Sequence, residues 1–161
     1  MNRKYTREYI FSVVDKLKET FEGVSLTCDI IVGYIDETDE EFTETMDGAQ
    51  RIEFSDMNVF KFSKRNHTRA YSLDTTVSPV VAHTRSEQLI NLGKKLKLEF
   101  LNKNIGTAAG VLLEEYKEGY LLGYTSNYIK TKVKGDKMLW GTIQELELIS
   151  LEKDLILGTI K

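Results

Sequence analysis

The chain opens with apolar residues at helical spacing and then changes to a two-residue alternation. The helical pattern follows Thr6, a suitable N-cap, and stops before Gly23, so it predicts a first helix. From Val24 to Val32 apolar and polar residues alternate, and the run becomes apolar on both sides at Ile31, as in a buried parallel strand. We therefore predict a strand that ends at Gly33. The apolar helical positions are Tyr9, Ile10, Val13, Val14, Leu17 and Phe21.

A second helix and strand follow. Thr38 and Glu41 have the spacing of a capping box, and the apolar positions after them predict a helix to about Glu53. The run from Met57 to Phe62 predicts another strand. This order indicates βα units with a parallel sheet, but two strands complete neither a barrel nor a doubly wound sheet.

The second half of the chain has a different character. Ser78 and Pro79 are suited to start a long helix that runs to about Asn104. From Ile105 onward there is no proline or arginine, and short β-rich runs are separated by turn pairs. Such runs predict a small closed β-barrel, so we divide the chain into domains at 1–97 and 98–161. The predicted strands are 107–115, 120–124, 128–134, 139–149 and 155–160.

Composition and charge limit the possible functions. The formal net charge of −3 gives no long-range attraction to nucleic acid or to an anionic membrane, so such binding requires a local patch. No apolar run approaches the roughly 18 residues of a membrane span, and we expect a cytoplasmic protein that does not bind membranes. Cys28 is the only cysteine, which excludes an internal disulfide and an iron–sulfur cluster held by several thiolates of this chain.

A basic run lies after the second predicted strand. It combines cations with neighbouring aromatic residues, a composition suited to phosphate contacts and base stacking, although a solvated loop has the same composition. Its cations are Lys61, Lys64, Arg65 and Arg69, and its aromatic residues are Phe60, Phe62 and Tyr71.

Lysines also alternate along the third predicted barrel strand. We expect Tyr128, Lys130, Lys132 and Lys134 on one side of it and Ile129, Thr131 and Val133 in the core. This lysine ladder is a candidate RNA-binding surface, but exposed lysines also protect strand edges.

Other residues have ordinary explanations. Asp36 and Glu37 precede a helix and suit its dipole, although acid–base or ribose-binding roles are alternatives. His67 and His83 have no metal-ligand spacing around them, so we predict neither a metal site nor catalytic residues. Cys28 on the first strand is expected to pack. Trp140 and the alternating Leu and Ile of 143–149 are predicted to be core.

Several motifs, in order, resemble the C-terminal half of the radical S-adenosylmethionine (SAM) tRNA methylthiotransferases. They are MNRKYT, TCDIIVG followed by ETDEEF, VFKFSKR followed by T-R-A, and GYTSNYIK. The resemblance is strongest to the branch that acts on N6-threonylcarbamoyladenosine beside the anticodon. It implies an α/β fragment, formed by the last βα units of a radical SAM partial barrel, followed by an OB-like TRAM barrel that binds RNA.

The resemblance also implies cofactors. The family uses SAM and two [4Fe–4S] clusters, but the cysteines that hold the clusters would lie upstream of Met1. We therefore expect this chain to be a C-terminal fragment that binds no cofactor and is inactive alone, retaining tRNA binding. A stand-alone RNA-binding module and a protein-interaction module are the alternatives, and exposed sheet edges predict self-association.

The loop after the first strand departs from the family pattern. By resemblance, Ile31, Gly33 and Glu37 are what remains of a SAM-side strand. Family members usually have Pro and Gly where this chain has Ile35 and Asp36, a change expected to remove a tight turn. They also usually have Gly before Thr68, where this chain has His67.

Overall fold

The computed structural model describes residues 4–74 and 76–161. The described residues form two compact units. One comprises the residues up to Glu19 together with Leu26–Lys97, and the other comprises Thr20–Ser25 together with Leu98–Lys161. The first three residues of the MNRKYT motif lie outside the described part.

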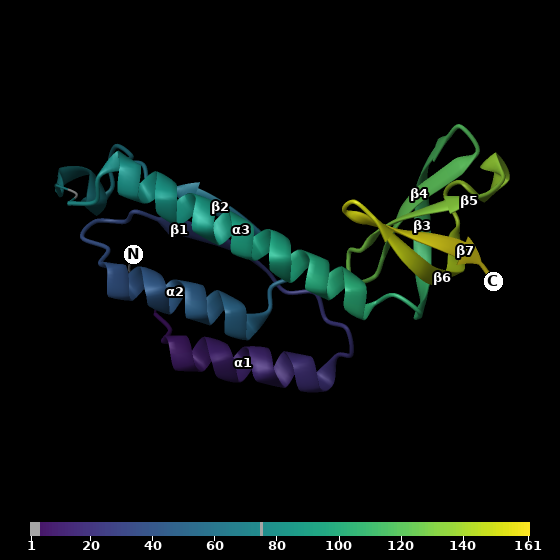
Figure 1. Ribbon diagram of the computed structural model, residues 1–161, viewed down its shortest axis with the longest axis horizontal. Coiled ribbons are helices and arrows are strands. Elements are labelled where there is room, and N and C mark those ends of the chain that lie inside the picture. Colours follow the sequence, from purple (N-terminus) through teal and green to yellow (C-terminus); the bar gives the residue numbers. More distant parts are fainter. Residues whose placement is uncertain (1–3, 75) are drawn as a thin grey trace. The chain divides into compact units, whose positions relative to one another are not determined.

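Helices and two strands make up the first unit (Figure 1). The Thr6 hydroxyl accepts a hydrogen bond from the Tyr9 amide at 3.2 Å, which confirms the predicted N-cap. The first strand begins at Thr27, three residues later than predicted, because Val24–Leu26 do not pair with the second strand. The elements are α1 (Arg7–Thr20), β1 (Thr27–Val32), α2 (Asp39–Ile52), β2 (Asp56–Lys61), the 3₁₀ helix η1 (Arg69–Ser72) and α3 (Pro79–Lys103), which from Leu98 onward belongs to the second unit.

Strands β1 and β2 are parallel, as predicted, and Ile30 lies opposite Val59. Helices α2 and α3 cover one face of this pair, where Val32, Phe42 and Leu89 are buried together. Ile30 and Val59 pack against the same cluster. Helices α2 and α3 therefore cover the side chains of Ile30, Val32 and Val59.

The other face of the two strands is more polar. The Asn58 side chain donates a hydrogen bond to the Asp29 carboxylate at 2.9 Å. Phe60, which lies opposite Ile31, has 52% of its surface exposed. This face therefore presents a polar pair and, toward the carboxyl ends of the strands, an exposed aromatic ring.

Local sequence signals set the ends of α2 and α3. Thr38 and Glu41 form the predicted capping box, with both reciprocal hydrogen bonds present. The Ser78 hydroxyl accepts a hydrogen bond from the Val81 amide at the start of α3. Both helices therefore begin where their sequence predicted.

The second unit is a closed barrel of five strands in the order β3-β4-β5-β7-β6. All neighbouring pairs are antiparallel except β5 and β7. This topology is consistent with the predicted OB-like barrel. The strands are β3 (Ala108–Lys117), β4 (Tyr120–Thr125), β5 (Lys130–Lys134), β6 (Ile143–Glu152) and β7 (Leu155–Ile160), with the 3₁₀ helix η2 (Lys137–Leu139) between β5 and β6.

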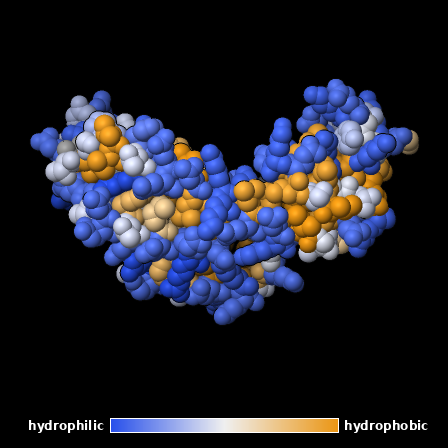
Figure 2. All heavy atoms as spheres, viewed as in Figure 1, coloured by the Kyte–Doolittle hydropathy of each residue, from blue (hydrophilic) through white to orange (hydrophobic). Residues whose placement is uncertain are grey.

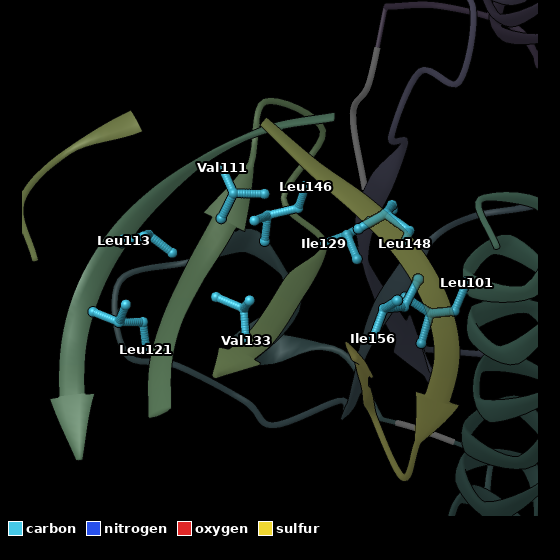
Figure 3. Close-up of a cluster of buried hydrophobic side chains, with 9 residues drawn as sticks. All are labelled: Leu101, Val111, Leu113, Leu121, Ile129, Val133, Leu146, Leu148 and Ile156. Carbon is cyan, nitrogen blue, oxygen red and sulfur yellow. The ribbon is translucent and has the colours of Figure 1, made fainter. Parts of the chain in front are cut away.

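Figure 3 shows the side chains that fill the barrel. They include Leu146 and Leu148 of β6, as predicted, but Trp140, Ile143 and Ile149 were wrongly placed in the core. Trp140 lies before β6 begins, and Ile143 and Ile149 point outward, so 57%, 71% and 52% of their respective surfaces are exposed. The buried cluster is Leu101, Val111, Leu113, Leu121, Ile129, Val133, Leu146, Leu148 and Ile156.

Candidate functional site

The loop after β1 keeps a tight turn despite its unusual sequence. The Glu37 amide donates a hydrogen bond to the Tyr34 carbonyl at 3.0 Å, which closes a four-residue turn. Asp36 occupies its third position with a φ of 58°. Our expectation that Ile35 and Asp36 abolish this turn was therefore wrong, since Asp36 adopts the positive φ that favours glycine.

A nearly buried ion pair anchors this loop to α3. The Arg85 guanidinium donates to the Glu37 carboxylate at 2.7 Å and to the Glu37 carbonyl at 2.9 Å. It also donates to the Asp39 carboxylate at 2.6 Å. The Glu37 carboxylate in turn accepts from the Gly33 amide at 2.8 Å. The Glu37 carboxylate thus joins the Gly33 amide to the Arg85 guanidinium.

Gly33 is required by packing against α3. A Cβ atom at this position would lie 2.8 Å from the Cβ of Ala82, and the φ of Gly33 is +69°. Ile31 is half-buried two residues earlier. Contacts within the chain therefore account for the glycine, and the role predicted for Ile31, Gly33 and Glu37 beside a cofactor stays a prediction.

The basic run forms an exposed connector after β2. Lys64 lies 3.9 Å from the Asp74 carboxylate, whereas no described side chain forms an ion pair with Arg65 or Arg69. His67 has a φ of 64°, again at a position where the family usually has glycine. Lys64, Arg65 and Arg69 are all exposed, and Arg65 and Arg69, which form no ion pair with a described residue, are the two cations of this connector that are available to a phosphate.

The lysine ladder has the predicted alternation. Ile129, Thr131 and Val133 are buried, while Lys130 and Lys132 are half-buried and Lys134 is exposed on the outer surface. Tyr128, with 83% of its surface exposed and a φ of 62°, lies in the turn before β5 and not on the strand itself. Its position at the end of the ladder is therefore set by a turn.

Two tyrosines that we did not predict complete this surface. On β4, Tyr120 lies opposite Lys134 and Tyr124 lies opposite Lys130. Each has about two-fifths of its surface exposed, at 40% and 39%. The sequence contained a signal for these two tyrosines, because the alternation along β4 puts Tyr120 and Tyr124 on the side of the strand opposite to the buried Leu121. We call Tyr120, Tyr124, Lys130, Lys132 and Lys134 the tyrosine–lysine face.

The three lysines of this face are not equivalent. The Lys132 ammonium lies 3.4 Å from the Glu152 carboxylate and 4.7 Å from the centroid of the Tyr120 ring. Lys130 and Lys134 form no ion pair with any residue that the structure describes. They are therefore the two positive charges on the face that are available to an anionic ligand.

The described residues do not fit an iron–sulfur cluster. A cubane cluster needs several thiolates, and Cys28 is the only cysteine of the chain. Burial raises the pKa of the Cys28 thiol to about 11, and the neighbouring Asp29 adds to the effect. Nor do three or more His, Cys, Asp or Glu side chains converge as metal ligands within 4–74 and 76–161.

Comparisons with curated proteins give the family relationship. The chain is 35% identical over 161 residues, 97% of its length, to the tRNA-2-methylthio-N(6)-dimethylallyladenosine synthase of Aquifex aeolicus. It is 34% identical over 92% of its length to the threonylcarbamoyladenosine tRNA methylthiotransferase of Bacillus subtilis. The chain is homologous to the tRNA methylthiotransferases.

This methylthiotransferase homologue spans about a third of the length of those relatives, 37% and 34% respectively. The two relatives act on different modified adenosines according to their names, and their nearly equal identities do not separate the two branches. The resemblance to the threonylcarbamoyladenosine branch in particular stays a prediction. No protein-family model matches the chain. No helix among the described residues is long and apolar enough to cross a membrane.

Proposed function

We propose that this chain binds tRNA for a methylthiotransferase and that the tyrosine–lysine face is the binding surface. The observation that carries the proposal is the pairing of Tyr120 with Lys134 and of Tyr124 with Lys130 across β4 and β5. Each pair sets an aromatic ring beside a cation, the combination that single-stranded nucleic acid requires for stacking and phosphate contact.

The topology of the barrel supports this choice of face. In OB folds the second and third strands form the surface that binds oligonucleotides, and β4 and β5 hold these positions here. This support is an analogy between folds, whereas the exposed Tyr120 and Tyr124, and the two lysines that form no ion pair with a described residue, are properties of this chain. The names of the homologues make tRNA the class of nucleic acid to test.

The wider activity of the family belongs to the same proposal. In a radical SAM enzyme of this kind, SAM and iron–sulfur clusters would supply the methylthiolation chemistry, and the described residues offer no set of thiolates for a cluster. We propose that this chain contributes RNA binding near the anticodon and that the Arg85–Glu37 pair maintains the loop after β1.

The test measures binding of a fluorescent anticodon stem-loop to the full chain at several salt concentrations. Two phosphate contacts to single-stranded RNA give a log–log slope of about −1.4, at about −0.7 each. The double variant Lys130→Gln/Lys134→Gln should lose most of this salt slope and most of the affinity. Lys94→Gln with Lys95→Gln on α3 makes the same change in net charge and should leave binding unchanged. Equal binding by both double variants would overturn the proposal.

The connector Lys64, Arg65 and Arg69 is a second candidate for phosphate contact because two of its three cations form no ion pair with a described residue. In the same titration, replacing Arg65 and Arg69 with Gln reports its share. We expect a smaller loss than for the barrel lysines, because the exposed rings that pair with cations across strands lie on the barrel.

A further inference from the structure

Aromatic and aliphatic side chains extend the tyrosine–lysine face across the neighbouring strands. Leu112 of β3 lies opposite both Tyr124 of β4 and Ile143 of β6, and Tyr124 lies opposite Lys130. Lys130, Tyr124, Leu112 and Ile143 thus form one row across four strands. Exposed hydrophobic side chains on the barrel are visible in the surface view (Figure 2).

Trp140 precedes Ile143 of this row by three residues and is held against β3. Its indole nitrogen donates to the Glu114 carbonyl of β3 at 2.8 Å. The next residue, Gly141, donates its amide to the Leu113 carbonyl at 2.7 Å. The side chain is nevertheless 57% exposed, so a large ring is fixed on the surface with part of it open to solvent.

We propose that Trp140 is a stacking platform for an unpaired base of RNA bound on the tyrosine–lysine face. This inference rests on the proposed function and adds a second contact point to it. The Trp140 indole is hydrogen-bonded to β3, and the lysines lie two strands away from β3, on β5. A strand spacing of about 4.8 Å makes that separation roughly 10 Å across the surface. OB folds bind roughly 4–16 nucleotides, so one single-stranded segment can reach both.

Charge favours RNA over a protein as the occupant of this surface. The row ends at Lys130, one of the two lysines without an ion pair among the described residues, and it includes Tyr124. Tyr124 opposite Lys130 suits a base and its phosphate, the fixed ring of Trp140 offers a second place for a base, and stacking is available with any base. A protein partner is the alternative that the experiment tests.

Trp140 is the only tryptophan of the chain, so its fluorescence reports on this position alone. The probes are a twelve-nucleotide oligouridylate and an abasic oligomer with the same number of phosphates. We expect the oligouridylate to quench the Trp140 emission along the same titration curve as binding measured by anisotropy. The abasic oligomer should bind more weakly and cause little quenching.

Variants of Trp140 give a second readout with labelled oligouridylate. Trp140→Ala should weaken binding about 5- to 150-fold, the range of a lost stacking contact, without changing the salt slope. Trp140→Phe keeps an aromatic ring and should retain most of the affinity. Met138→Ala, at an 87% exposed residue of η2, is the matched control and should bind normally.

The outcomes separate this inference from the proposed function. If RNA binds without changing the Trp140 emission, and Trp140→Ala binds RNA with normal affinity, the stacking role is wrong. The surface around Trp140 would then be a site for a protein partner. Absence of RNA binding by the unmodified chain would overturn both proposals. Quenching together with a weakened Trp140→Ala variant supports both.

Discussion

The Arg85 guanidinium of α3 and the Glu37 carboxylate of the loop after β1 lie 2.7 Å apart, and only 6% and 11% of their side-chain surfaces are exposed. This pair joins two segments 48 residues apart in the sequence. Removing one partner of a buried pair leaves an uncompensated charge. We therefore expect Arg85→Met to lower the free energy of unfolding by about 3–5 kcal/mol, measured by urea denaturation.

Two further variants test this explanation. Lys97→Met breaks an ion pair with Asp56 that is largely exposed and should cost about 0–1 kcal/mol. Replacing Glu37 with Met in the Arg85→Met background removes the stranded carboxylate and should recover part of the loss. If Arg85→Met cost no more than Lys97→Met, the pair would not anchor the loop.

Gly33→Ala tests the close approach of the loop to α3. The added Cβ would lie 2.8 Å from the Ala82 Cβ, and the positive φ adds strain. We expect a loss of about 2–5 kcal/mol, combining roughly 1–2 kcal/mol of backbone strain with about 1–3 kcal/mol of overpacking. Gly119→Ala has a similar φ, +82°, and no atom within 4 Å, so it should show the strain alone. Equal losses in thermal unfolding would contradict the packing argument.

Glu152 should weaken RNA binding by neutralising Lys132. Its carboxylate lies 3.4 Å from the Lys132 ammonium. Glu152→Gln frees that charge for a third phosphate contact, so affinity should rise and the salt slope should steepen by about 0.7. The control is Glu147→Gln, at an exposed acid of the same strand that forms no ion pair with a described residue. An equal gain from both variants would indicate net charge as the cause.

Cys28 should react slowly with alkylating reagents. Its pKa of about 11, against an ordinary value of 9.0, leaves about 100-fold less thiolate at pH 8, and the thiolate is the nucleophile. Alkylation of the folded chain should therefore be slow at pH 8 and rise toward pH 11. Urea-unfolded chain is the control and should react at an ordinary rate. Fast labelling of the folded chain at pH 8 would contradict the raised pKa.

The same shift makes stability depend on pH. The folded chain holds the Cys28 thiol proton more tightly than the unfolded chain. The thiol therefore makes its full contribution to the free energy of unfolding below about pH 9, and this contribution is lost as pH rises toward about 11. Cys28→Ser removes the titrating thiol. Comparing unfolding of the two proteins across this range isolates the contribution.

Self-association is expected to involve the open side of β1, which pairs only with β2 among the described residues. Sedimentation at increasing concentration should show a dimer or larger species, because an unpaired strand edge can accept another strand. Ile31→Lys should suppress it, whereas Ile149→Lys, on an outward position of β6, should not. A monomer at all concentrations would show that this edge accepts no second copy.

Much of the fold could be predicted because its signals are local. The capping box at Thr38 and Glu41 and the serine before Pro79 each set a helix start, and alternation located the five strands of the barrel. Trp140 and Ile143 were misplaced because alternation does not show where β6 starts or which of its faces points outward. Nor could sequence alone reveal that Arg85 reaches Glu37, although its place one turn before the buried Leu89 was a signal.

The left-handed residues Asp36 and His67 have a consequence for how relatives are recognised. Both occupy positions where the resemblance leads one to expect glycine, and both keep a positive φ of 58° and 64°. Each such residue costs of order 1 kcal/mol or more relative to glycine, and the surrounding contacts must offset it. At Asp36 these include the Glu37–Tyr34 turn and a hydrogen bond from the Thr76 hydroxyl at 3.0 Å. A pattern search that demands glycine at these two places would pass over chains whose backbone still follows the same path.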